Sequence, residues 1–248
     1  MQLLLINPNT TEAITDLVLG AALHFASPDT TLRAATGRFG ARYITTRAAS
    51  AVAAHAALDA YAEHGATADA VVLACFGDPG LAGLKEIAHQ PVIGMAEAAC
   101  LTAAALGRRF AIVTGGERWG PMLEEFVASI GLADKLAVVK TVAPSGADIA
   151  RDPEGSLGLL ADACTDCVTA YGADAVVLGG AGLAGLAARL ADRVPVPLVD
   201  GVGAAVRAAE ALVALQTRKA VVGSYAPTTP VETVGLAPAL AELFTRKA

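Results

Sequence analysis

One stretch decides the fold: DAVVLACFGDPGLAGL at Asp69–Leu84, which the chain repeats 105 residues later as DAVVLGGAGLAGL at Asp174–Leu186. Each copy opens with a continuous apolar run, which is typical of a parallel strand covered on both faces. Glycines follow, and they mark a tight turn out of the strand. The copies differ at one position with chemistry in it, because Cys75 in the first corresponds to Gly180 in the second. The stretch therefore predicts two similar units that do not share the same reactive group.

Two further junctions repeat in the same order. RFAIVTGGER from Arg109 aligns with LLLINPNTTE from Leu3, and PLVDGVGAA from Pro197 aligns with PVIGMAEAA from Pro91, each pair 106 residues apart. A period of this length is too long for a solenoid repeat and suits a duplicated domain. We therefore predict an α/β protein with two pseudo-symmetric α/β domains, mostly parallel sheets, and the active site in the cleft between them.

The domain boundaries follow from the repeat. We expect a second lobe over residues 99–205 and a discontinuous first lobe over residues 1–98 plus 206–248. The tail beyond the second unit, KAVVGSYAPTTP and VETVGLAPALAELF, is expected to add a strand and a helix to the first lobe.

Composition excludes several classes of protein. Of 248 residues, 54% are hydrophobic but only 4% are aromatic, so the core must be built from Ala, Val and Leu. The net charge is −6 with no basic run, which argues against nucleic acid as a partner. No segment resembles a membrane span, and the N-terminus lacks the features of a signal peptide. The cysteine usage fits a reducing cytoplasm.

Strand and helix patterns alternate along the chain. Asn9 is placed to cap a helix with Glu12 as its capping-box partner, and Asp78 is placed to cap a helix opened by Pro79. The expected strands are Leu3–Asn7, Thr31–Ala35, Ala70–Ala74 and Val92–Met95, and the expected helices include Arg47–His64 and one ending at Leu106.

Unusual residues gather where these strands end, which is where open α/β sheets bind ligands. Cys75 would lie at the start of a helix, so we expect the helix dipole to lower the pKa of its thiol and favour a catalytic thiolate. A buried structural cysteine is the alternative, and it is the preferred interpretation for Cys100 and for the Cys164/Cys167 pair on a helix. The predicted substrate-binding residues are Asn9, Phe76, Gly77, Thr114, Gly115, Gly116, Gly179, Gly180 and Ala181, and we expect no metal ligands.

At these junctions the chain resembles the aspartate/glutamate racemase superfamily, and within it the hydantoin and allantoin racemases. The resemblance rests on INPNT at Ile6–Thr10 and ACFGDPGL at Ala74–Leu81, with support from GRRFAIVT, VVLGGAGLAGL and PLVDGVGAAV further on. It implies a cofactor-independent isomerase of small carboxylates or hydantoins and, by analogy, a homo-oligomer. It also implies two cysteines flanking the carbon that loses its proton, and Cys75 matches the first of them.

The second family cysteine corresponds to Gly180, and this departure leaves alternatives open. Another group could supply the second proton: water, Tyr43, Asp78 or Glu117. The enzyme could instead work from one side, as a single-cysteine decarboxylase of malonate-type substrates or by nucleophilic cysteine chemistry, or the glycine could replace a natural cysteine. A different class of function is also open, in which the chain is a non-catalytic protein that binds small anions. Arg42, Tyr43 and Trp119 are further candidates to shape the pocket, although packing at a helix start is the preferred interpretation for Trp119.

Overall fold

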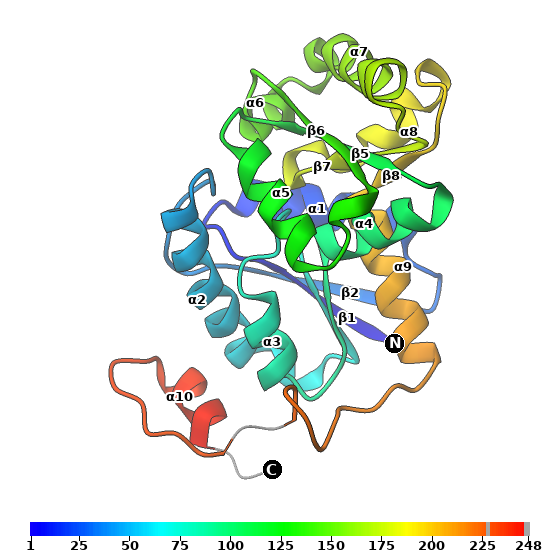
Figure 1. Ribbon diagram of the computed structural model, residues 1–248. Helices are drawn as coiled ribbons and strands as arrows, with labels where there is room; N and C mark the ends of the chain where they lie inside the picture. Colours follow the sequence, from blue (N-terminus) through cyan, green and yellow to red (C-terminus); the bar gives the residue numbers. More distant parts are fainter. Residues whose placement is uncertain (227–228, 246–248) are drawn as a thin grey trace.

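The computed structural model describes residues 1–226 and 229–245 and contains two four-stranded parallel sheets of the same topology (Figure 1). The strand order is β2–β1–β3–β4 in the first sheet and β6–β5–β7–β8 in the second, so the predicted duplication is confirmed. The strands are β1 Gln2–Asn7, β2 Thr31–Thr36, β3 Ala70–Leu73, β4 Val92–Gly94, β5 Phe110–Gly115, β6 Leu136–Val142, β7 Ala175–Gly179 and β8 Leu198–Asp200.

The central strands are buried on both faces, as their continuous apolar runs predict. Every residue of β3, β5 and β7 is buried. Leu3 pairs with Ala70 in the first sheet, and Phe110 pairs with Ala175 in the second. The carboxyl ends of β1 and β3 therefore lie side by side, as do those of β5 and β7.

Helices cover both faces of each sheet, and two of them pass between the sheets. α4 follows the first sheet yet packs against β7 of the second, and α9 follows the second sheet yet packs against β3 of the first. The helices are α1 Glu12–Phe25, α2 Arg47–His64, α3 Leu81–Ile87, α4 Met95–Leu106, α5 Trp119–Ser129, α6 Gly146–Arg151, α7 Pro153–Tyr171, α8 Leu186–Leu190, α9 Gly201–Ala214 and α10 Pro238–Thr245, with short 3-10 turns η1 Gly65–Thr67, η2 Ala133–Lys135, η3 Ala181–Leu183 and η4 Ala191–Arg193.

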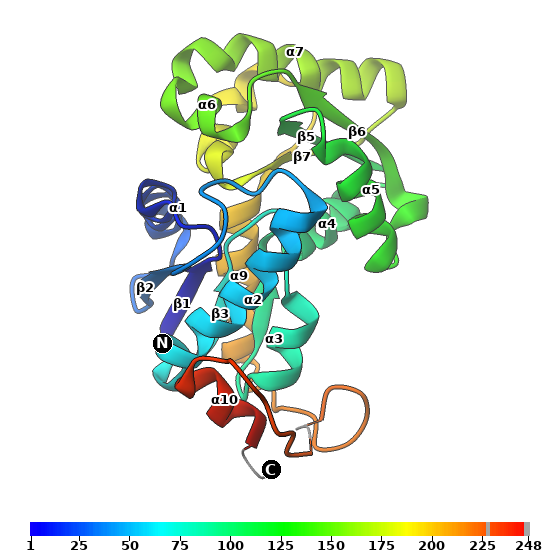
Figure 2. The same ribbon diagram turned by 90° about the vertical axis from the view of Figure 1, so that its left-hand side faces the viewer.

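This exchange of helices joins the two halves through one core. The largest cluster of buried residues includes Leu5 of the first sheet, Ile112 of the second, and Cys100 and Val206 on the exchanged helices. Smaller clusters lie under α2 and α3 and under α7 and α8, on the outer faces of the sheets (Figure 2). The predicted lobe boundaries after residues 98 and 205 fall inside α4 and α9, and the division into domains stays a prediction.

Two predicted helix caps are wrong. α1 begins at Glu12 with Thr11 as its N-cap, and Asn9 bends the chain before it by accepting a hydrogen bond from the Thr11 N–H at 2.8 Å. α3 begins at Leu81 after a left-handed Gly80, without a side-chain cap. The Asp78 carboxylate instead accepts hydrogen bonds from the first turn of α4, which follows the neighbouring strand, and sequence spacing cannot show such a contact.

The tail departs from prediction in one respect. Residues 219–226 form no strand, and 227–228 of that segment lie outside the described residues. The tail passes the last turn of α3, where Lys219 Nζ donates to the backbone carbonyls of Lys85 and Glu86, and it pairs with no strand there. The predicted helix is confirmed as α10, which packs against α2 of the first half (Figure 2).

Glu210 on α9 fastens the exchanged helix to the first half. Its carboxylate accepts hydrogen bonds from the backbone N–H and hydroxyl of Ser27, from the Thr30 hydroxyl at 2.6 Å and from Arg207. Burial alone would raise the pKa of Glu210, but these donors hold it below its usual value.

We expect Glu210→Ala to lower the free energy of unfolding by about 1–3 kcal/mol, because the part-buried donors on Ser27 and Thr30 lose their acceptor. Since the folded state lowers this pKa, the wild-type contribution is present above about pH 4.5 and is lost as the pH falls through the folded-state pKa. Urea unfolding at pH 7 and at pH 3.5 measures both effects. A difference between variant and wild type that is equally large at the two pH values would contradict the assignment.

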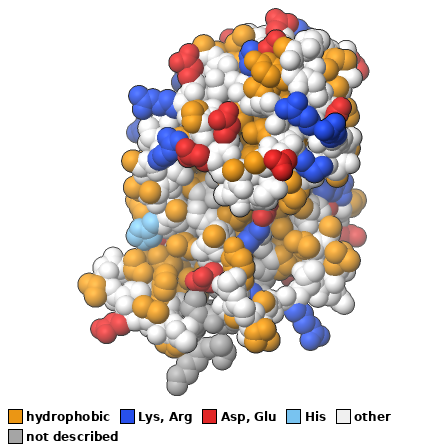
Figure 3. Space-filling model, viewed as in Figure 1, with side chains coloured by type: hydrophobic (Ala, Val, Ile, Leu, Met, Phe, Trp, Pro, Cys, Tyr) orange, Lys and Arg blue, Asp and Glu red, His pale blue; other side chains and the backbone are white. Residues whose placement is uncertain are grey.

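The surface carries charges of both signs. On the face shown in Figure 3, Lys and Arg side chains are interspersed with Asp and Glu rather than gathered into one field. Within the described residues, no helix combines the length and the apolar character needed to cross a bilayer.

Candidate functional site

A small cavity lies where the carboxyl ends of the two sheets face each other. Its volume is about 30 Å³, and seven of the ten predicted site residues line it. The first half contributes Asn9, Tyr43, Ile44, Cys75 and Phe76, and the second half contributes Thr114, Gly115, Trp119, Gly180 and Ala181.

The remaining predicted residues, Gly77, Gly116 and Gly179, lie next to the lining in sequence without forming part of it. They shape the site indirectly. A Cβ on Gly179 would lie 2.5 Å from the Phe76 ring, and one on Gly77 would lie 3.0 Å from the Trp119 ring. Glycine at these positions therefore lets the two aromatic rings lie against the backbone.

Three lining residues were not assigned to the site from the sequence. Tyr43 and Trp119 were candidates to shape the pocket and both line the cavity, whereas Arg42 is exposed and lies outside the lining. Ile44 was missed altogether. Tyr43 and Ile44 come from the long connection between β2 and α2, and no motif in that connection shows that it folds over the site.

Backbone contacts hold this connection over the end of β1. The Gly37 N–H donates to the Asn7 carbonyl at 2.8 Å, and the Thr11 hydroxyl donates to the Arg42 carbonyl at 2.6 Å. Thr46 then caps α2 by accepting a hydrogen bond from the Ala49 N–H. Tyr43 is thus carried on a segment that is fixed on both sides.

The Cys75 thiol is only 7% exposed, and it packs against Ile44, Ala53 and Trp119. This burial raises the pKa of Cys75 well above its usual value, and the nearby Asp78 carboxylate adds to the effect. The predicted lowering of this pKa by a helix dipole is therefore wrong. Because α3 starts six residues later, at Leu81, the thiol is not at a helix N-terminus.

Several polar groups of the lining have no partner within the described residues. The Nδ2 amide of Asn9 and the hydroxyl of Thr114 make no hydrogen bond to protein. No side-chain nitrogen or oxygen that is shut off from solvent lacks a partner in the described part of the chain, so these two atoms face the cavity. The backbone N–H groups of Phe76 and Ala181 likewise donate to no described group, and they can serve as donors to a ligand.

Gly180 occupies a backbone conformation that suits glycine alone. Its φ is +130°, in a region that other residues rarely adopt. Space is not the obstacle, since an added Cβ would lie 3.3 Å from Leu183 Cδ1 and 3.7 Å from Thr114 Oγ1. The strand end at β7 therefore offers backbone donors and no titratable side chain.

Each half contains a carboxylate that joins a loop beside the cavity to the start of a helix. In the first half the carboxylate lies on the loop, and in the second half it lies at the start of the helix. Asp78, after β3, accepts hydrogen bonds from the N–H groups of Ala96 and Glu97 at the start of α4. In the second half Asp200, at the end of β8, caps α9 and accepts a hydrogen bond from the Gly185 N–H at 2.7 Å. Burial raises the pKa of Asp78 to about 8, although the hydrogen bonds from the Ala96 and Glu97 N–H groups act to lower it. Both carboxylates tie a site loop to the start of a central helix.

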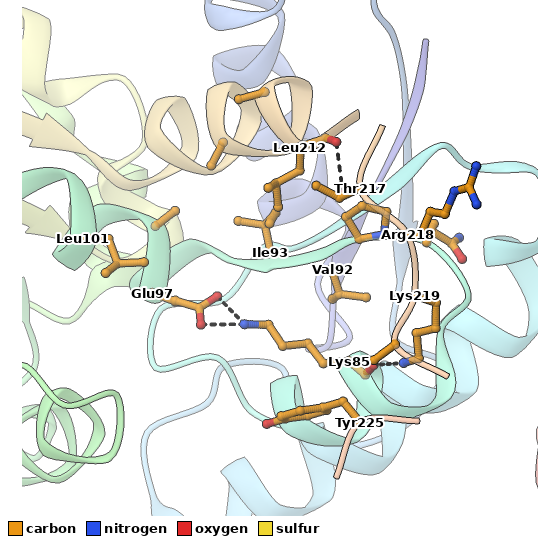
Figure 4. A pocket seen from close by; sticks show the side chains of 16 residues that line it. Lys85, Val92, Ile93, Glu97, Leu101, Leu212, Thr217, Arg218, Lys219 and Tyr225 are labelled. Carbon is orange, nitrogen blue, oxygen red and sulfur yellow. Dashed lines mark hydrogen bonds and ion pairs between the residues drawn. The ribbon is translucent and has the colours of Figure 1, made fainter. Parts of the chain in front are cut away.

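A larger hollow lies away from this chemistry. It has a volume of about 590 Å³ and is bounded by α4, α9 and the tail (Figure 4). Figure 4 shows the Lys85–Glu97 ion pair and Lys219 reaching the end of α3, among mostly apolar side chains. None of the predicted site residues lines it.

The cavity at Cys75 is smaller than a substrate. A volume of about 30 Å³ accommodates one or two water molecules, whereas ligand sites usually measure about 300–1,000 Å³. The lining comes from both halves. The Arg47–Glu125 ion pair joins α2 of the first half to α5 of the second and is exposed on both sides.

Comparisons with known proteins cover nearly the whole chain. The family model described as Asp/Glu/Hydantoin racemase matches residues 3–209. The hydantoin racemase of Paenarthrobacter aurescens is 37% identical over 89% of this chain and 95% of its own length. Allantoin racemase from Pseudomonas fluorescens superposes with a TM-score of 0.91 at 33% identity, covering 95% of this chain and 100% of that one. Allantoin racemase from Klebsiella pneumoniae gives the same TM-score of 0.91 and identity of 33%, over 97% and 98% of the two chains.

Proposed function

The chain belongs to the Asp/Glu/hydantoin racemase family, and from that premise we propose that it is a hydantoin-type racemase in which Cys75 transfers a proton at a carbon beside a carboxylate or imide carbonyl. The observation that carries the proposal is the position of this thiol. Cys75 lines the cavity between the sheets, at the end of β3, opposite the free backbone donors at the end of β7.

The chemistry follows from the weak acidity of such a carbon. When the Cys75 thiolate takes the proton, the electron pair of the C–H bond moves into an enolate. Donors placed in advance at the developing oxygen lower this barrier. The N–H groups of Phe76, Gly77, Gly180 and Ala181 are proposed for this role, with Asn9, Thr114 and Gly115 positioning the ring or carboxylate.

Substrate binding must precede ionisation of the thiol. In the closed cavity Cys75 is held neutral by burial. A bound ring that brings N–H groups and water into the site replaces part of the apolar surroundings, and this favours the thiolate. The proposal uses no metal ion or organic cofactor, as the family resemblance implies.

The test uses single enantiomers of 5-substituted hydantoins and of amino acids in D₂O, with optical rotation and deuterium incorporation followed together. We expect loss of rotation accompanied by deuterium at the carbon that loses its proton. A protein that binds these compounds but causes neither change would overturn the proposal in favour of a binding function.

A decarboxylase is the second candidate, because Cys75 is the one thiol in the lining of the cavity. A substituted malonate would lose CO₂, and the thiol would return one proton to a single face. Release of CO₂ with formation of one enantiomer, and no racemisation of hydantoins, would support this alternative.

The raised pKa of Cys75 predicts a pH dependence. Since the thiolate is the reactive form, kcat/KM for the direction in which Cys75 is the base should rise about tenfold per pH unit between pH 7 and pH 9. Alkylation of Cys75 by iodoacetamide should follow the same slope, measured by mass spectrometry of the labelled peptide. A plateau reached below pH 8 would contradict the raised pKa.

A further inference from the structure

We propose that the Tyr43 hydroxyl is the second proton carrier of the site, acting on the face of the substrate carbon opposite Cys75. This inference rests on the proposed racemase function and assigns the role that Gly180 cannot fill. The three observations behind it are the position of the hydroxyl, its freedom from other partners, and the absence of rival groups from the described lining.

The Tyr43 side chain starts in the first half and ends against the second. Its hydroxyl lies against Gly146, where an added Cβ would be 1.8 Å from the oxygen. Gly146 in turn touches η3, because a Cβ on Gly182 would lie 2.0 Å from the Gly146 carbonyl oxygen. The hydroxyl therefore lies beside the loop that carries Gly180, across the cavity from the strand end that carries Cys75.

The hydroxyl is available for chemistry. No hydrogen bond joins it to another described residue, and every side-chain oxygen shut off from solvent in the described part has a partner. The Tyr43 oxygen is therefore accessible to solvent or to a ligand, and the side chain that carries it lines the cavity. Burial, together with the nearby Cys75 and Asp148, raises the pKa of Tyr43 above its usual value, which keeps the hydroxyl protonated and able to donate a proton.

The other protein groups considered from the sequence lie elsewhere. Asp78 is buried against the start of α4 and does not line the cavity. Glu117 is exposed and borders a separate surface hollow with Arg118. Within the described lining, Cys75 and Tyr43 are the two titratable side chains.

The duplication shows that this arrangement is specific to one half. The connection GARYI at residues 40–44 corresponds to GADIA at residues 146–150, which places Ile149 opposite Tyr43. The second half thus has no titratable side chain at either position, with Gly180 corresponding to Cys75 and Ile149 to Tyr43. Both carriers come from the first half, and the length of the tyrosine side chain lets one of them reach the far wall.

The proton inventory balances over one turnover. The Cys75 thiolate accepts the proton, so an S–H bond forms as the C–H bond breaks and the electron pair enters the enolate. The Tyr43 O–H bond then breaks as a new C–H bond forms on the other face, which leaves a phenolate. After product release, solvent carries a proton from the Cys75 thiol to the phenolate, and the reverse reaction uses the same groups in exchanged roles.

The test is Tyr43→Phe, assayed with each pure enantiomer in D₂O. The substitution removes only an oxygen without a partner, so folding should be unaffected. We expect racemisation to fall about 10²–10³-fold, while deuterium exchange with retention persists for the enantiomer whose hydrogen faces Cys75. Tyr171→Phe, on the exposed end of α7, is the matched control and should leave both rates unchanged.

A second variant keeps the test decisive. If the Cys75 thiol returns the same hydrogen, exchange would be lost together with racemisation in Tyr43→Phe. In that case adding Gly180→Cys should restore racemisation at least about tenfold if a missing opposite-face acid is the cause. Racemisation within threefold of wild type in Tyr43→Phe overturns the proposal, as does loss of both rates without rescue. A wild-type protein that neither exchanges nor racemises any substrate would instead overturn the proposed function.

Discussion

Cys75→Ala should lower kcat/KM for racemisation by about 10³–10⁴-fold, because no other described group of the lining can act as base on that face. Substrate binding should survive, since Asn9, Thr114 and the backbone donors are untouched. Optical rotation measures the first effect, and calorimetric titration with a slowly reacting hydantoin measures the second.

The matched control is Cys100→Ala. Cys100 is fully buried in α4, within the core shared by the two sheets. The same change there should cost about 1–2 kcal/mol of the free energy of unfolding and leave turnover unaltered. A Cys75→Ala protein that retains more than a tenth of wild-type turnover would remove the thiol from the mechanism.

Gly182→Ala is expected to have a large effect on both stability and catalysis, and this effect acts through the backbone. Its Cβ would lie 2.0 Å from the Gly146 carbonyl oxygen and 2.7 Å from the carbonyl carbon, and neither atom belongs to a flexible side chain. The η3 turn and the Gly146 loop must therefore move apart. We expect a loss of about 1–3 kcal/mol in the free energy of unfolding.

The same displacement should disturb catalysis. Gly180 lies on one of the separated segments, and the Tyr43 hydroxyl rests on the other. A shift of about 1 Å between reacting groups is worth about 10² in rate, so kcat should fall by that factor. Denaturant unfolding and steady-state kinetics on the same preparation measure both.

Gly158→Ala in α7 provides the comparison, because nothing lies within 4 Å of the added Cβ. There the substitution should stabilise the protein by about 0.4–1 kcal/mol through helix propensity and chain entropy. Equal effects of the two variants would show that the contact between Gly146 and Gly182 carries no strain.

The backbone conformation of Gly180 bears on why this strand end carries no titratable side chain. A cysteine would fit the space but not the φ of +130° without strain of about 1–3 kcal/mol. The local backbone conformation therefore favours glycine at this position. In the proposed mechanism the contribution of Gly180 is its backbone N–H group, which donates to the developing negative oxygen.

The sequence alone determined the duplicated α/β fold, because three strand-to-helix junctions recur in register and continuous apolar runs require burial on both faces. It also predicted Cys75 and most of the cavity lining, since parallel strands bring their carboxyl ends together. Only the tertiary structure decided which groups meet there. Asp78 caps a helix of the neighbouring strand, burial outweighs any helix dipole at the Cys75 thiol, and Tyr43 crosses to the second half from a connection without a motif. Each of these depends on contacts between segments far apart in the chain, and local periodicity and spacing carry no record of such contacts.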